Sequence, residues 1–276
     1  MGVILGLAAA ILYGGSDFGG GLVSRRLGFL PVSVVGSAAA AMLAWVALLA
    51  SGGPGPSVRA IAWGLVAGLG GGAGSLILYR GLARGQMSVV GPVSAVAAAA
   101  VPVAAGIALG ERPPLLAMIG IVVALPAIVL VAASGSARGI LSPALLDGLG
   151  AGVAFGVLFI GLAQAGKGAG LWPIASEQTG ALLLTAAVAA QARVPLRAAI
   201  RAAGWPVLVG ASGMIATLLY FYATHFSMLA TAAVLVSLYP GVTVLLARVV
   251  LHERFSPAQR AGLGLCTLAV VAIALN

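Results

Sequence analysis

The chain has 276 residues, of which 62% are apolar and only 7% are charged, and its mean hydropathy is +1.17. A soluble domain carries about a quarter charged residues, so this composition excludes a water-soluble fold and predicts a protein dissolved in a lipid bilayer. The net charge of +9 comes from basic residues dispersed along the chain. Because they form no basic stripe with interleaved aromatic residues, we expect no nucleic-acid partner.

Ten apolar segments follow one another along the chain, each near the roughly 20 residues that a helix needs to cross a bilayer. Charges, prolines and glycine-rich breaks such as Ser51–Pro56 separate them. We therefore predict an all-α integral membrane protein. Its ten transmembrane helices are expected at residues 2–23, 31–50, 60–83, 87–109, 115–133, 144–165, 171–192, 204–225, 229–250 and 257–275.

The chain repeats itself under a shift of 142 residues. Residues that coincide under this shift include Leu109 with Leu251, Glu111 with Glu253, Arg112 with Arg254, Gly6 with Gly148 and Gly14 with Gly156. Only five residues are acidic, so chance is a poor explanation for the coincidence of two of them. A half with five crossings is inverted relative to its copy. We predict two inverted five-helix repeats, residues 1–134 and 143–276.

The arginines predict the orientation of the chain. Loops after odd-numbered helices hold Arg25, Arg26, Arg80, Arg84, Arg138, Arg193, Arg197, Arg201, Arg248, Arg254 and Arg260, whereas the other loops hold only Arg59, Arg112 and Lys167. Since basic residues favour the cytoplasmic side, we predict a multi-pass protein of the inner or plasma membrane with both termini outside.

Asp17 lies inside the first segment, and an ionisable residue within a membrane span is a candidate functional residue. We expect it about four residues, or roughly 6 Å, from the cytoplasmic end, on one helix face with Tyr13 and Gly20. It would accept a proton or bind a substrate ammonium. The alternative is an ion pair with Arg80 or Arg84.

Glu177 is a second candidate, because helix 7 must begin near Leu171 to reach the length of a span. A salt bridge with Lys167 at the rim is the alternative. Glu111 and Glu253, in contrast, lie at helix corners beside arginines, where a carboxylate caps the next helix, and we interpret them as structural.

Hydroxyl groups inside the spans need partners, so they either line a cavity or bond to neighbouring helices. Ser75 maps onto Thr217 under the shift, and Tyr79 maps onto Phe221. The candidate substrate-binding residues are Tyr13, Asp17, Ser75, Tyr79, Ser94, Glu177, Thr217, Tyr220 and Tyr239.

Three consecutive glycines, Gly70, Gly71 and Gly72, fall near the middle of the third segment. Each weakens a helix by about 1 kcal/mol relative to alanine, so they are a candidate hinge beside a midplane site. The alternative is a thin surface where another helix crosses.

Enzymatic chemistry is not indicated. A single cysteine, Cys266, excludes an internal disulfide, and the two histidines offer no convincing metal set. We expect no catalytic residues, metal or cofactor, and the chain has no Walker motif for direct use of ATP.

Several stretches resemble EamA-type members of the drug/metabolite transporter superfamily. In the first half they are Leu12–Phe18, Tyr79–Ala83, Ser88–Pro92 and Gly110–Arg112, and in the second half Tyr222–His225, Ala230–Val234, Tyr239–Pro240 and His252–Arg254. The resemblance covers nearly the whole chain as two five-helix units. It implies a ten-helix carrier with a central cavity between the repeats. The chain departs from the family pattern at Tyr13, where tryptophan is frequent, and at Asp17, where the position is often neutral.

These observations predict a secondary transporter that moves small organic metabolites, amino-acid-like solutes or drugs by alternating access. Export or exchange is expected, with energy from the solute gradient or from protons through Asp17 or Glu177. The partners are then the substrate and the lipid bilayer, with the protein a monomer or weak homodimer. A channel-like passive pore is the alternative, and a membrane-embedded enzyme a third hypothesis that the scarcity of catalytic side chains disfavours.

Overall fold

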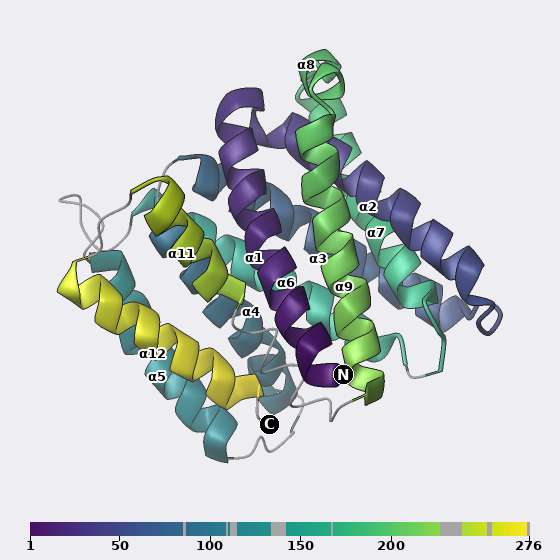
Figure 1. Ribbon diagram of the computed structural model, residues 1–276. Helices are drawn as coiled ribbons and strands as arrows, with labels where there is room; N and C mark the ends of the chain where they lie inside the picture. The colour runs from purple at the N-terminus through teal and green to yellow at the C-terminus, as the bar shows by residue number, and fades with distance from the viewer. Residues whose placement is uncertain are drawn as a thin grey trace.

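The computed structural model describes residues 1–84, 87–108, 110, 115–133, 142–166, 168–226, 239–252 and 256–274. Within these ranges every regular element is a helix (Figure 1). The helices are α1 (Gly2–Leu27), α2 (Phe29–Ser51), α3 (Val58–Ala83), α4 (Met87–Ala108), α5 (Leu115–Ala133), α6 (Pro143–Gln164), α7 (Trp172–Gln191), α8 (Arg197–Arg201), α9 (Gly204–Phe226), α11 (Tyr239–Val250) and α12 (Pro257–Ala274).

The helices follow the predicted segments, and the described ends differ from the predicted ones by at most four residues. The short α8 was not predicted and lies in the connection before α9. The predicted segment 229–250 is described only from Tyr239 onward. In the described part of the chain, six helices are long and apolar enough to cross a membrane, and two apolar stretches, Met118–Leu130 and Tyr239–Val250, are shorter. The protein is therefore a multi-pass membrane protein.

Helix α1 is longer than predicted. Arg25 and Arg26 belong to its last turn, and it ends at Gly28, whose φ of 84° lies in the left-handed region that glycine adopts readily. The N–H of Gly28 donates to the carbonyl of Ser24 at 3.0 Å. Asp17 consequently lies ten residues before the end of the helix, about 15 Å along its axis, and not the predicted four residues.

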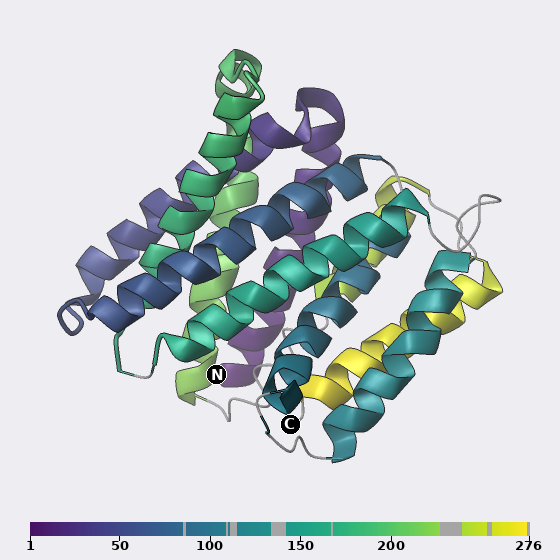
Figure 2. The ribbon, with the colours of Figure 1, turned by 180° about the vertical axis from the view of Figure 1, so that it is seen from behind.

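The packing of the helices follows the repeat. Helix α1 packs against α9 and α11 of the second half, and its counterpart α6 packs against α3 and α4 of the first half. Helix α3 also packs against α7, and the equivalent helices α9 and α2 pack against each other. Other contacts pair helices with their own counterparts, such as α5 with α12 and α2 with α7. Helices α5 and α12 lie side by side and run in opposite directions (Figures 1 and 2). The two halves are thus interlocked around an approximate two-fold relation.

The same relation holds for single contacts. A Cβ added at Gly71 would lie 2.7 Å from Leu158 Cδ1, and a Cβ added at Gly213 would lie 3.2 Å from Ser16 Oγ. Gly71 maps onto Gly213 and Ser16 onto Leu158 under the shift of 142 residues. Glycine therefore permits the same close crossing twice, once between α3 and α6 and once between α9 and α1.

Helix α3 lies between α6 and α7 and packs through glycines on both sides. A Cβ at Gly70 would lie 2.6 Å from the carbonyl oxygen of Ala154 in α6, and a Cβ at Gly72 3.0 Å from that of Ala181 in α7. All three residues of Gly70–Gly72 have helical backbone inside α3. The structure thus shows the close helix crossing that the sequence left as an alternative, and a hinge at this run stays a prediction.

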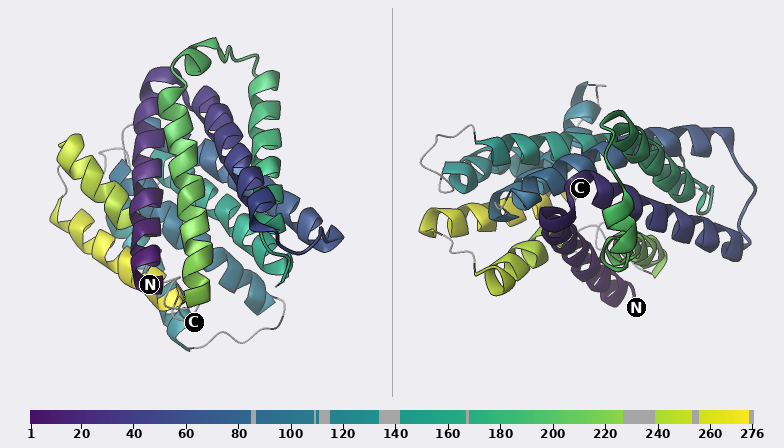
Figure 3. Two further views of the ribbon diagram at one scale, coloured as in Figure 1. Left: turned by 45° about the vertical axis from the view of Figure 1, so that its right-hand side comes forward. Right: turned by 90° about the horizontal axis from the view of Figure 1, so that it is seen from above.

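Both termini lie at one end of the bundle, and α8 lies at the opposite end (Figure 3). Consecutive long helices alternate in direction, so the C-terminal ends of α1 and α3 lie at the α8 end (Figures 1 and 3). The last turns of these helices carry Arg25, Arg26 and Arg80. We call this end, with Arg197 and Arg201 of α8, the arginine end.

Candidate functional site

Polar side chains from four helices meet around the middle of α1. The hydroxyl of Tyr13 in α1 and that of Thr217 in α9 are hydrogen-bonded at 2.8 Å, and Thr217 also donates to the Gly213 carbonyl at 3.1 Å. The ring of Tyr13 contacts that of Tyr239 in α11, with centroids 6.1 Å apart. Three of the predicted site residues are therefore brought together from both repeats.

Asp17 lies one turn further along the same face of α1 and is partly buried. Tyr13, Tyr79 and Tyr239 are each close enough to its carboxyl group to interact with it electrostatically. The ring of Tyr79 reaches α1 from α3, where a Cβ at Gly20 would lie 2.5 Å from Tyr79 Cε1. Asp17 makes no hydrogen bond or ion pair with another residue that the structure describes. We call Tyr13, Asp17, Tyr79 and Tyr239 the Asp17 cluster.

Glu177 lies in α7, as predicted, and is only 6% exposed. One carboxyl oxygen, Oε1, points at α3, where a Cβ at Gly71 would lie 2.8 Å away. Tyr13 interacts electrostatically with this carboxyl group as well as with Asp17, and also with Tyr220 of α9. Tyr13 is therefore linked electrostatically to both carboxyl groups. The predicted alternative partner, Lys167, is outside the described residues.

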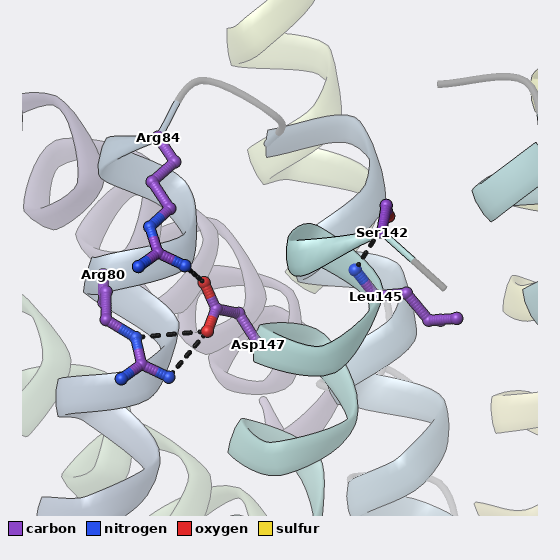
Figure 4. Close-up of polar contacts among 5 residues, drawn as sticks. All are labelled: Arg80, Arg84, Ser142, Leu145 and Asp147. Atoms are coloured by element: carbon purple, nitrogen blue, oxygen red, sulfur yellow. Dashed lines mark hydrogen bonds and ion pairs between the residues drawn. The ribbon is translucent and has the colours of Figure 1, made fainter. Parts of the chain in front are cut away.

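The alternative ion pair of Asp17 with Arg80 or Arg84 is wrong, because both arginines bind Asp147 of α6 (Figure 4). Arg80 donates to Asp147 Oδ1 through Nη2 at 2.7 Å and through Nε at 3.1 Å, and Arg84 Nη1 donates to Oδ2 at 2.9 Å. The carboxylate is buried, whereas the arginines keep 42% and 54% of their side chains exposed. The three residues join the C-terminal end of α3 to the N-terminal part of α6.

Asp147 was not singled out from the sequence. As an ionisable residue within the predicted segment 144–165, it met the same criterion that selected Asp17. Its position in the second turn of α6, which Ser142 caps through the N–H of Leu145 at 3.2 Å, also suits a carboxylate at the positive end of a helix dipole. The pairing of Asp147 with Arg80 and Arg84 depends on the contact between α3 and α6, which the sequence around these residues does not predict.

The equivalent positions around α6 are apolar. Tyr13 maps onto Phe155, Asp17 onto Phe159 and Thr243 onto Val101. Thr243 donates to the Gly14 carbonyl at 3.1 Å, while Val101 packs against Gly156, the counterpart of Gly14. The polar cluster therefore occurs only around α1 in the described residues, although the helix packing around α1 and around its counterpart α6 is equivalent.

This difference explains Ser75, the counterpart of Thr217. Thr217 bonds to the Tyr13 hydroxyl, but the residue equivalent to Tyr13 is Phe155, which has no hydroxyl. Ser75 instead donates to Gly72 of its own helix at 3.0 Å. Ser94 likewise donates within its helix, to Gly91 at 2.8 Å. The structure does not bring these two serines into the Asp17 cluster.

A small apolar pocket lies between α4, α11 and α12, and Asp17 is not among its lining residues. Its lining includes Pro92, Pro240, Cys266 and Thr267. It has no charged group, and we place the candidate site at the Asp17 cluster because chemistry is concentrated there. Glu111 and Glu253, interpreted as helix caps, lie outside the described residues.

Fold and site together define a helical membrane protein of two related halves with polar groups at their interface. The chain belongs to the EamA-like transporter family, whose model matches residues 1–133 and 142–275. A solved crystal structure that carries no functional description is similar to it, with a TM-score of 0.58 and 16% identity over 98% of this chain and 95% of that chain. At this identity the likeness shows the fold alone. No curated protein matches the chain. Family membership makes the protein a membrane transporter of small solutes.

Proposed function

We propose that the protein is a secondary transporter that moves small organic metabolites, amino-acid-like solutes or drugs by alternating access, as an exporter or exchanger. The observation that carries this proposal is the composition of the polar cluster. Tyr13, Asp17 and Tyr79 come from the first repeat, whereas Thr217 and Tyr239 come from the second. Because the site is shared between the halves, a rocking of one half against the other changes its access and its contacts together.

We further propose ten crossings of the inner or plasma membrane, with the arginine end in the cytoplasm and both termini outside. The distribution of arginines supports this orientation. The protein would act as a monomer or weak homodimer, and the Gly70–Gly72 run would serve as the hinge if α3 bends during the cycle.

Glu177 is the proposed proton site. It is a buried carboxyl group that has no cationic partner among the described residues and is packed against Gly71, which leaves no space for an organic solute beside it. A buried carboxyl group in a bilayer avoids the cost of an unpaired charge by binding a proton. Tyr13 would couple the protonation state of Glu177 to the Asp17 cluster, since it interacts with both carboxyl groups.

Counterflow in proteoliposomes tests the transport function. Vesicles are loaded with an unlabelled extract of small metabolites and diluted into traces of the same extract labelled with carbon-13. We expect saturable accumulation of particular labelled solutes, measured by mass spectrometry, in vesicles with the protein and none in empty vesicles. Uptake that rises linearly with concentration would instead identify a passive pore, and no uptake of any solute would refute the proposal.

The variant Glu177→Gln tests the coupling. We expect that a pH gradient drives accumulation in the wild type, and that the variant loses this drive but keeps solute exchange. Thr185→Val is the matched control, because Thr185 is a buried polar residue of α7 whose hydroxyl bonds only within its helix, to Leu182 at 3.1 Å. Equal responses of wild type and Glu177→Gln to the gradient would exclude Glu177 as the proton site.

A further inference from the structure

The charge of Asp17 is not balanced by any residue that the structure describes. An ionised carboxyl group inside a bilayer is costly unless a cation or a proton neutralises it. The two arginines on the neighbouring helix α3, Arg80 and Arg84, are both engaged by Asp147. Asp17 has no ion pair with any residue in the described ranges, so its carboxyl group is open to a cation that enters the site.

The surroundings of Asp17 suit an organic cation. Tyr13 lies one turn before Asp17 on the same face of α1, and its ring contacts that of Tyr239 from α11. On the other side of Asp17 the ring of Tyr79 from α3 lies against Gly20, three residues further along α1. Aromatic rings beside a carboxylate bind ammonium groups through cation–π attraction added to charge attraction. A metal ion requires several oxygen, nitrogen or sulfur ligands at one point, and the described residues contain no cluster of three acidic, histidine or cysteine side chains.

The two carboxyl groups differ in the space around them. Glu177 is buried and its oxygen faces the backbone of α3, whereas Asp17 is only partly buried. Tyr13 is oriented by its bond to Thr217, and its ring supports that of Tyr239. The aromatic side of the cluster is thus held in place before a solute enters, which reduces the entropic cost of binding.

We propose that Asp17, with the rings of Tyr13, Tyr79 and Tyr239, binds a substrate ammonium group, so that the transported solutes are organic cations or amines. This inference rests on the proposed transport function and specifies its substrate class. Asp17 neutralises the ammonium charge, and the tyrosine rings cover its alkyl substituents. The equivalent positions around α6 include Phe155 and Phe159, so the pseudo-symmetric position has no carboxylate and would not bind the cation.

Binding is tested on the full chain purified in detergent, by equilibrium dialysis with tetramethylammonium, tetraethylammonium and phenyltrimethylammonium. These ions are permanently charged, so pH does not alter them. We expect saturable binding of at least one ion to the wild type, a loss of at least tenfold in Asp17→Asn, and retention within about threefold in Asp17→Glu and in the control Thr185→Val, whose hydroxyl bonds only within α7. Failure of all three ions to bind, or equal binding by Asp17→Asn, would overturn the inference.

The aromatic contribution is tested separately at Tyr239. Tyr239→Phe keeps the ring and is expected to bind within about twofold of wild type, whereas Tyr239→Leu removes the ring and is expected to lose several-fold. Equal binding by both variants would leave Asp17 as a simple counter-ion and refute the role of the ring.

The counterflow experiment separates a failure of the ammonium site from a failure of the proposed transport function. Saturable transport of neutral or anionic solutes alone contradicts the ammonium site and leaves the transporter intact, whereas absence of any transport contradicts both.

Discussion

Asp17 and Asp147 are both carboxylates inside helices of an apolar protein, but their surroundings give them different roles. Asp147 is buried beneath two arginines that satisfy both of its oxygens, so its charge is compensated within the fold. Asp17 lies among three tyrosines with no cationic partner in the described residues. A compensated carboxylate contributes to structure, and an uncompensated one is available for a ligand. The location of the arginines, rather than that of the acids, separates the two.

Removal of the Asp147 charge should weaken the junction of α3 and α6. In Asp147→Asn the charge-assisted bonds to Arg80 and Arg84 are lost together, and we expect destabilisation of about 1–3 kcal/mol, seen as a lower unfolding temperature of the detergent-solubilised protein. Arg84→Gln is the graded control, because Arg80 keeps its two bonds to Oδ1, and its cost should be smaller. An unchanged unfolding temperature in Asp147→Asn would show that these partly exposed arginines are satisfied equally well by water.

At the scale of the elements, glycines decide how closely the helices approach. A Cβ at Gly68 of α3 would collide with the Glu177 carbonyl and lie 2.7 Å from Gly180 Cα of α7. These are backbone atoms, which cannot rotate away as a side chain does. The predicted spacing of small residues therefore corresponds to real crossings, and the position of Glu177 depends on one of them.

Gly68→Ala should consequently separate α3 from α7, with an expected cost of about 1–3 kcal/mol and a lower yield of folded protein. Gly264→Ala in α12 is the matched control, since a Cβ there meets no atom within 4 Å and alanine favours a helix by up to about 1 kcal/mol. Size-exclusion profiles and unfolding temperatures of both variants provide the measurement. Equal unfolding temperatures and elution profiles for Gly68→Ala and Gly264→Ala would contradict the close contact of α3 with α7 at Gly68.

The sequence predicted the helices well because charges, prolines and glycines mark their ends. It predicted less of the site, since Tyr13 meets Thr217, and Arg80 meets Asp147, only through contacts between the two halves. Helix α1 exceeds the predicted length because Arg25 and Arg26 form its last turn, where arginines interact favourably with the helix dipole, and do not begin a loop. The repeat itself points to the carboxylates that it does not copy, since Asp17 maps onto Phe159 and Glu177 onto Val35, and their role stays a prediction.

At the scale of the whole molecule, the helix packing follows the two-fold repeat, whereas the polar residues of the candidate site do not. The crossings of α3 with α6 and of α9 with α1 use equivalent glycines, Gly71 and Gly213. The Asp17 cluster lies beside the second crossing, whereas the helices of the first crossing are joined by the ion pairs of Asp147 and have Glu177 Oε1 facing Gly71. The two crossings therefore differ in chemistry, and the asymmetry gives the transporter distinct sides.

The orientation of those sides is tested by labelling of single cysteines in intact cells. With Cys266 replaced by serine, Gly55→Cys lies in the connection between α2 and α3, where a Cβ meets no atom within 4 Å, and Ala198→Cys lies exposed in α8. If the arginines hold the α8 end in the cytoplasm, an impermeant maleimide added outside should label position 55 and leave position 198 unlabelled until the membrane is permeabilised. The reverse pattern would place the termini inside.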